Sequence, residues 1–163
     1  MQNQNKQIKE KGSALVETLV GSILLMLFTF FTIDLSQTTF TLHRINYLSK
    51  KSARGASLSA GKRVGEVKEK SRNEILPALL KDLRAGRIQS IDISLLNQNG
   101  NKIPDNTTIE SDTVLTFRLD ANLSMSFVPF RLFALFAPSA GTQKIFLPDG
   151  RFHYKTDVTF IVE

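Results

Sequence analysis

The stretch SALVETLVGSILLMLFTFFTI, Ser13 to Ile33, decides how the rest of the chain is arranged. Its only charged residue is Glu17. As a helix this stretch would be roughly 31 Å long, which is enough to cross the hydrocarbon core of a bilayer. A charge inside such a segment is costly and is usually kept for a function. We therefore expect a membrane-spanning helix with one unusual carboxylate near its start.

Two other interpretations of this segment are a cleaved secretory signal and the core helix of a soluble protein. The run is longer than the apolar part of a usual signal peptide, and the following stretch DLSQTTFTLHRINYL, 34–48, contains no alanine for a signal-peptidase site. A small soluble domain rarely buries a helix that is apolar on all its faces. The prediction is a retained single-pass helix.

Basic residues flank the apolar segment on both sides, so their number alone does not fix its orientation. They are Lys6, Lys9 and Lys11 before it, and Arg44, Lys50, Lys51 and Arg54 after it. The folded remainder of the chain lies C-terminal to the segment. We therefore expect a cytoplasmic N-terminus and an extracytoplasmic head.

Beyond the membrane segment the apolar pattern changes from helical spacing to alternation. Helical spacing continues to about Ala60, and 62–72 read as a solvated linker or a charged helical turn. A short amphipathic helix is then predicted around Leu76–Leu83, ended by Gly86. Alternation in IDISL (91–95) and TVLTFRLDANL (113–123) predicts strands, and KIFL-PDG-RFHYKTDVTFIVE (144–163) predicts a hairpin turning at 148–150.

These patterns predict an α+β protein in which a long N-terminal transmembrane helix precedes a small head with a short helix and an antiparallel sheet. The expected divisions are a basic leader over 1–12, an N-terminal helix over 13–60 that spans the membrane at about 14–34, and an extracytoplasmic head over 61–163.

Composition narrows the functional classes. The chain has no cysteine, which excludes disulfides, a lipoprotein anchor and thiolate metal sites. Its net charge is +6, and the surplus lies in 44–87, where twelve Lys or Arg face four acids. Few aromatic residues accompany those charges, so nucleic acid is not an expected partner. A hydrated helix face is the simplest explanation of the basic segment, and contact with anionic headgroups or an acidic partner is the alternative.

Residue groupings typical of catalysis are missing from the sequence. No phosphate-binding loop, dinucleotide fingerprint, G-x-S-x-G or H-E-x-x-H motif occurs. His43 and His153 belong to different predicted elements, and the acids of DNTTIESD, 105–112, lack EF-hand spacing. We expect no enzyme activity, no metal and no cofactor.

Four phenylalanines recur at a spacing of three in SFVPFRLFALFAP, 126–138. On a helix they would form a broad apolar patch. The patch would either pack over the sheet as core or contact a neighbouring subunit or the membrane surface. The four residues are Phe127, Phe130, Phe133 and Phe136.

The run KEKGSALVETL, 9–19, resembles the leader of a type IV prepilin. Such leaders are basic, end in glycine and precede an apolar helix with glutamate at the fifth mature position. With Ser13 as the first mature residue, Glu17 is the fifth. The resemblance implies that a prepilin peptidase cuts between Gly12 and Ser13 on the cytoplasmic face of a bacterial inner membrane.

Among prepilins, SALVETLV is closest to the TadE-like pseudopilins of the tight-adherence (Flp) pilus system, which start with small residues followed by a V-E pair. IDLSQ (33–37) and SARGA (52–56) resemble the helix exit and the alanine-arginine-glycine stretch of that family. The resemblance implies a minor pseudopilin that assembles with other pilin subunits and an inner-membrane platform. The alternatives are a membrane-anchored binding module, or another type IV pilin or type II secretion pseudopilin.

Elementary electrostatics gives Glu17 a role that does not depend on which pilin family the chain resembles. Cleavage would expose the amine of Ser13, a cation with an ordinary pKa near 8. One turn away, Glu17 would pair with that amine in its own helix or in a neighbouring subunit, which would offset the cost of burying the carboxylate and set an axial register between helices. The simpler alternative is a Glu17 hydrated at the membrane interface.

Overall fold

The structure is a computed structural model that describes residues 2–124 and 151–163, with side chains from Ala14 onward. It comprises two units, Met1–Gln37 and Thr38–Glu163, and the first helix belongs to both. The elements are α1 (Gln2–Ser57), α2 (Val64–Ala78), α3 (Leu80–Arg84), β1 (Ile88–Leu96), β2 (Val114–Ser124) and β3 (Arg151–Ile161). A long apolar helix followed by a head with short helices and an antiparallel sheet confirms the predicted α+β class.

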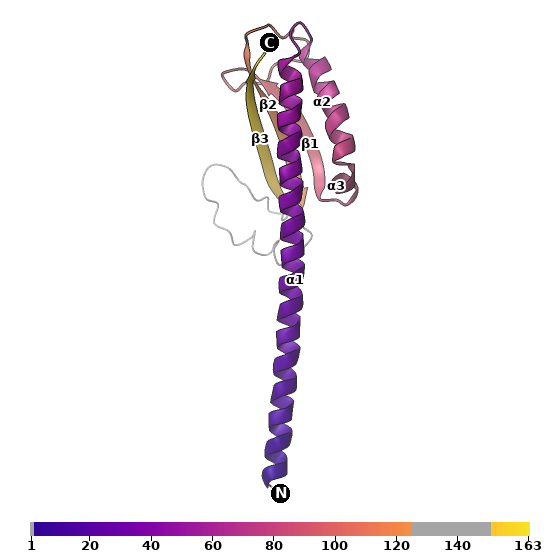
Figure 1. Ribbon diagram of the computed structural model, residues 1–163, viewed down its shortest axis with the longest axis vertical. Coiled ribbons are helices and arrows are strands. Elements are labelled where there is room, and N and C mark those ends of the chain that lie inside the picture. Colours follow the sequence, from indigo (N-terminus) through magenta and orange to yellow (C-terminus); the bar gives the residue numbers. More distant parts are fainter. Residues whose placement is uncertain (1, 125–150) are drawn as a thin grey trace. The chain divides into compact units, whose positions relative to one another are not determined.

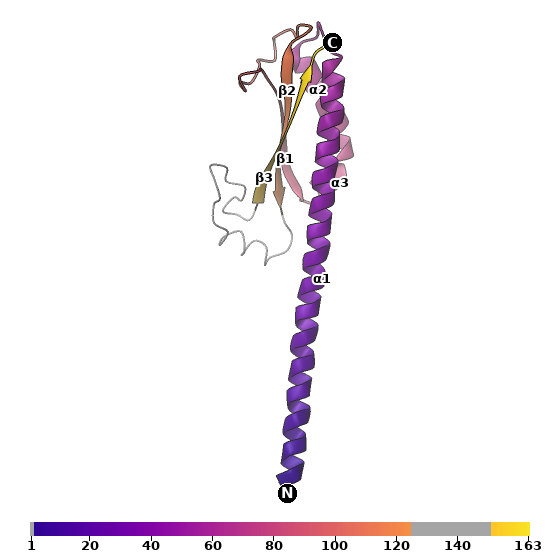
Figure 2. The ribbon, with the colours of Figure 1, turned by 60° about the vertical axis from the view of Figure 1, so that its left-hand side comes forward.

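The sheet of the head is antiparallel, and its strands lie in the order β1-β2-β3. Side chains along β2 alternate between buried and half-buried, as the sequence of 113–123 predicted. Within the head, the C-terminal half of α1 lies with α2 and α3 on one face of the sheet (Figures 1 and 2). The opposite face carries the polar side chains.

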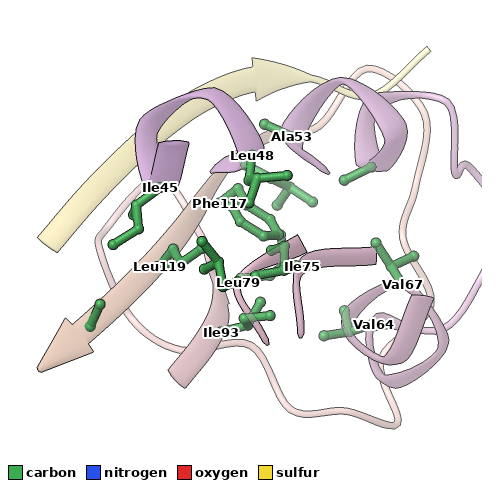
Figure 3. Close-up of a cluster of buried hydrophobic side chains, with 14 of the residues drawn as sticks. Ile45, Leu48, Ala53, Val64, Val67, Ile75, Leu79, Ile93, Phe117 and Leu119 are labelled. Carbon is green, nitrogen blue, oxygen red and sulfur yellow. The ribbon is translucent and has the colours of Figure 1, made fainter. Parts of the chain in front are cut away.

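The core of the head lies between this helical layer and the sheet (Figure 3). Phe117 and Leu119 of β2 are fully buried, as are Ile45 of α1 and Ile75 of α2. Several small residues of α1 are also buried in the head. The buried small residues of α1 are Ser49, Ser52, Ala53, Ala56 and Ser57.

Of the two alternatives predicted for 62–72, the solvated linker is wrong, because most of this segment is helical and belongs to α2, which is longer than the single charged turn of the other alternative. Its buried residues Val64, Val67, Ser71 and Ile75 recur at helical spacing, which gives the helix an apolar stripe among many charges. Ser71 is thus a buried interior residue of the helix. Pro77 lies in the last turn of α2, and a short α3 follows after Leu79.

One turn and one strand of the head follow the sequence-based expectations. Gly86 adopts a positive φ of 70° after α3, a conformation that favours glycine. The second arm of the predicted hairpin is β3, which pairs with β2. Its first arm, its turn at 148–150 and the four predicted patch residues Phe127, Phe130, Phe133 and Phe136 lie outside the described residues.

Candidate functional site

The apolar half of α1 exposes its large side chains on every face. Leu24, Leu25, Phe28 and others are each more than half exposed, and this part of the helix is not buried inside the protein. Its length and hydropathy are sufficient to cross a membrane. Such a surface is unfavourable in water and is consistent with a single-pass membrane anchor.

The hydroxyl groups within this segment are satisfied by the helix itself. Thr18 donates to the carbonyl oxygen of Ala14 at 2.7 Å, and Ser22 donates to that of Thr18 at 2.8 Å. Thr29 and Thr32 make the same bond to the residue four positions before them, each at 2.8 Å. A hydroxyl bonded in this way needs no water, so these residues lower the apolarity of the segment without preventing its insertion.

The predicted processing residues all belong to α1. Gly12 and Ser13 lie within the helical backbone, and Glu17 is an exposed residue of the apolar half. Ser13 and Glu17 are separated by four residues, which places them on the same side of a helix and about 6 Å apart along its axis.

In the head, a buried carboxylate joins α1 to α3 and to the start of β1. The Asp82 side chain is 6% exposed and accepts hydrogen bonds from Arg44 Nη1 at 3.1 Å and from Arg87 Nη1 at 3.4 Å. Thr41 Oγ1 donates to the same carboxylate at 3.4 Å. Two half-buried guanidinium cations and a hydroxyl thus offset the cost of burying this charge.

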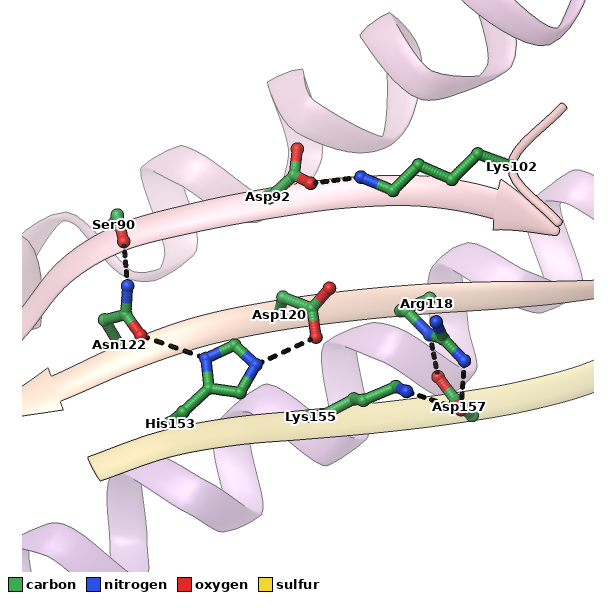
Figure 4. Close-up of polar contacts among 9 residues, drawn as sticks. All are labelled: Ser90, Asp92, Lys102, Arg118, Asp120, Asn122, His153, Lys155 and Asp157. Carbon is green, nitrogen blue, oxygen red and sulfur yellow. Dashed lines mark hydrogen bonds and ion pairs between the residues drawn. The ribbon is translucent and has the colours of Figure 1, made fainter. Parts of the chain in front are cut away.

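On the open face of the sheet, polar side chains pair across the strands (Figure 4). Asn122 donates to Ser90 Oγ at 2.8 Å, and its Oδ1 lies 3.0 Å from His153 Nδ1. His153 Nε2 lies 3.5 Å from Asp120 Oδ1, a buried oxygen that has no hydrogen-bond partner among the described residues. These contacts order the face and fix the register of the three strands.

The strongest pair on this face joins β2 to β3. Arg118 Nε and Nη2 donate to the two carboxylate oxygens of Asp157 at 2.8 and 2.9 Å. This hydrogen bonding lowers the pKa of Asp157 and raises the pKa of Arg118, against the opposing effect of burial. Lys155 Nζ lies 3.9 Å from the same carboxylate.

The described residues contain no group of three or more His, Asp, Glu or Cys side chains that could hold a metal ion. Asp105, from the acidic loop, pairs with Lys68 at 2.7 Å. One hollow of about 330 Å³ beside Ile103 and Ile109 is mainly apolar, and one of about 580 Å³ lies between α2 and β1. Neither hollow brings together residues arranged for acid–base or nucleophilic chemistry.

Reasoning from the sequence missed the contacts of Asp82 and of Asp157. Their partners Arg44 and Arg118 lie 38 and 39 residues away along the chain, so no local pattern connects them. Alternation in β2 does place Arg118 on the polar face, but the register with β3 decides that Asp157 lies opposite.

Comparison with protein-family models, with curated proteins and with solved structures found no match to this chain.

Proposed function

We propose that this protein is a minor pseudopilin of the TadE-like type, cut by a prepilin peptidase between Gly12 and Ser13 and used in the assembly of a tight-adherence pilus. One observation carries the proposal. A glycine lies five residues before a glutamate, at the start of an apolar helix that precedes a folded head.

The exposed apolar half of α1 supports the membrane part of this proposal. Glu17 is the sole charge between Ser13 and Ile33, so its carboxylate needs a partner once it is in a bilayer. The amine released at Ser13 would supply that partner. Pairing within one helix would leave the assembled register unspecified, whereas pairing between subunits would fix it.

Intact mass measurement of the membrane-extracted protein tests the processing step. Cells that contain the peptidase should yield a chain beginning at Ser13, and Gly12→Val should yield only the uncut chain. Gly21→Val is the matched control, because Gly21 lies in the same helix with no heavy atom near its absent Cβ. An uncut chain in the wild type would contradict the proposal.

Assembly is tested separately with Glu17→Gln. This variant should be cut at Ser13 as usual but should fail to co-purify with the other pilin subunits, since the amide cannot form the ion pair. If Gly12→Val and Glu17→Gln both leave pilus assembly unchanged, a membrane-anchored binding module becomes the better explanation.

A further inference from the structure

The head has two ends that its own contacts define. At the basal end, Thr41 and Arg44 of α1 contact Asp82 of α3. At the distal end, the backbone N–H of Glu163 donates to the carbonyl oxygen of Ser57, the last residue of α1, at 2.8 Å. The stretch of α1 within the head therefore runs from the basal to the distal end.

The basal end gathers positive charge from several elements. Besides α3, it contains one end of each strand. The N–H of Ser124, the last residue of β2, donates to the carbonyl oxygen of Arg87, just before β1, at 2.7 Å. Ser124 also pairs with Arg151, the first residue of β3. Against a single carboxylate, Asp82, the described residues of this end carry Arg44, Lys81, Arg84, Arg87 and Arg151.

The single carboxylate does not neutralise the basal end. Asp82 is buried and already paired with Arg44 and Arg87, so it does not neutralise the other cations of this end. Lys81 and Arg84 are exposed, and neither forms an ion pair with another described residue. Both cations are therefore available to a ligand outside the protein.

Charge at the distal end has the opposite balance. The described turns at 58–63, 97–113 and 162–163 carry three cations and four carboxylates: Lys62, Arg63 and Lys102, and Asp105, Glu110, Asp112 and Glu163. The largest surplus of positive charge among the described residues of the head thus lies at its basal end, whereas the distal turns carry one more carboxylate than cations.

Chain connectivity limits how far the basal end can lie from the end of the apolar run. Thr41 lies seven positions after Asp34, the residue that follows the apolar run. Even a fully extended chain of that length reaches only about 25 Å. Lysine and arginine gain roughly 1 kcal/mol each near an anionic leaflet, an attraction that fades within a Debye length of about 8 Å.

We infer that the basal end of the head, through Lys81 and Arg84, binds the anionic headgroups of the bilayer in which α1 is anchored. The phosphate groups of acidic lipids are the ligand, and the contact holds the head against the surface. The inference needs α1 in a membrane but not cleavage after Gly12, so it does not depend on the proposed function.

The absence of cysteine from the chain permits a direct test. The full chain carrying Ala85→Cys, an exposed position beside Arg84, is labelled with a fluorophore and reconstituted into vesicles of phosphatidylcholine alone or mixed with phosphatidylglycerol. A quencher attached to the lipid headgroups should quench the label strongly only in the mixed vesicles, and added salt should reverse the effect. A label at the distal Asn99→Cys should respond to neither change.

Charge removal identifies the residues responsible. Lys81→Gln with Arg84→Gln should reduce the ratio of bound to unbound heads by about fivefold for each lost cation. Lys62→Gln with Arg63→Gln removes the same charge from exposed positions at the distal end and should leave quenching unchanged. Equal quenching in both vesicle types, or equal loss in both variants, would overturn the inference. Circular dichroism of each variant verifies that the head is folded.

Discussion

At the scale of single residues, Asp157 is the group whose protonation should be visible in stability. Hydrogen bonds from Arg118 hold its pKa below the ordinary value of 3.8. The folded state therefore binds this proton less readily than the unfolded state does. The resulting stabilisation is complete above pH 3.8 and is lost as the pH falls through the lower pKa of the folded state.

Replacement of Asp157 by Asn should remove that dependence. Because the Asp157 side chain is 40% exposed, solvent screens the pair, and we expect a loss of only about 0.5–1 kcal/mol at neutral pH. The gap between wild type and variant should close under acid conditions, which urea unfolding at a series of pH values measures. Asp92→Asn, in an exposed pair with Lys102, is the control and should show almost no gap. A gap for Asp157→Asn that persists in acid would contradict this account.

At the scale of elements, Asp82 is the contact on which the attachment of α1 to α3 depends most. Asp82→Ala would leave Arg44 and Arg87 partly buried without their carboxylate, and we expect the head to lose roughly 2–3 kcal/mol of unfolding free energy. Asp92→Ala, which breaks an exposed pair, should cost less than about 1 kcal/mol. Denaturant unfolding of both variants compares them, and equal losses would show that burial of the Asp82 pair is unimportant.

A glycine within α1 offers a substitution that should stabilise the head. Gly55 lies in the helix with no heavy atom within 4 Å of the position a Cβ would take. Gly55→Ala should therefore stabilise the head by about 0.5–1 kcal/mol through helix propensity. Gly86→Ala should instead destabilise it, because its φ of 70° suits glycine. Thermal unfolding of the two variants measures whether each change raises or lowers the stability of the head. A destabilised Gly55→Ala would contradict the expectation that this face of α1 has room for a Cβ.

The elements differ in how far local sequence determines them. The apolar run before Asp34 and the alternation of Leu115, Phe117 and Leu119 each repeat over many residues, so the helix and β2 were predictable. In α2 only four residues are buried, and most of the others are charged or polar. Packing against the sheet therefore stabilises this helix, and its local sequence pattern was too weak to predict it. The Asp82 contacts depend on tertiary structure for the same reason, whereas the roles of Gly12 and Glu17 stay a prediction from their spacing and from the resemblance to prepilin leaders.

At the scale of the whole molecule, the two units expose different kinds of surface. From Ala14 to Ile33 most exposed side chains are apolar. In the head, apolar side chains gather in one core, and the open face of the sheet is covered by paired polar groups. The surface of the first unit therefore requires an apolar environment, which is consistent with a single-pass membrane anchor, whereas the surface of the head suits water.

This requirement predicts different results for two leucines of similar exposure. Leu24 is 61% exposed in the apolar half of α1, and Leu58 is 63% exposed just beyond the end of the helix in the head. Arginine at the centre of a membrane helix costs about 2.5–3.5 kcal/mol, so Leu24→Arg should move much of the protein from the carbonate-resistant membrane fraction to the extractable fraction. Leu58→Arg adds the same charge in water and should leave the protein fully membrane-bound. If both variants fractionate like the wild type, Leu24 does not lie in the bilayer core, and the anchor must be sought in another part of the chain.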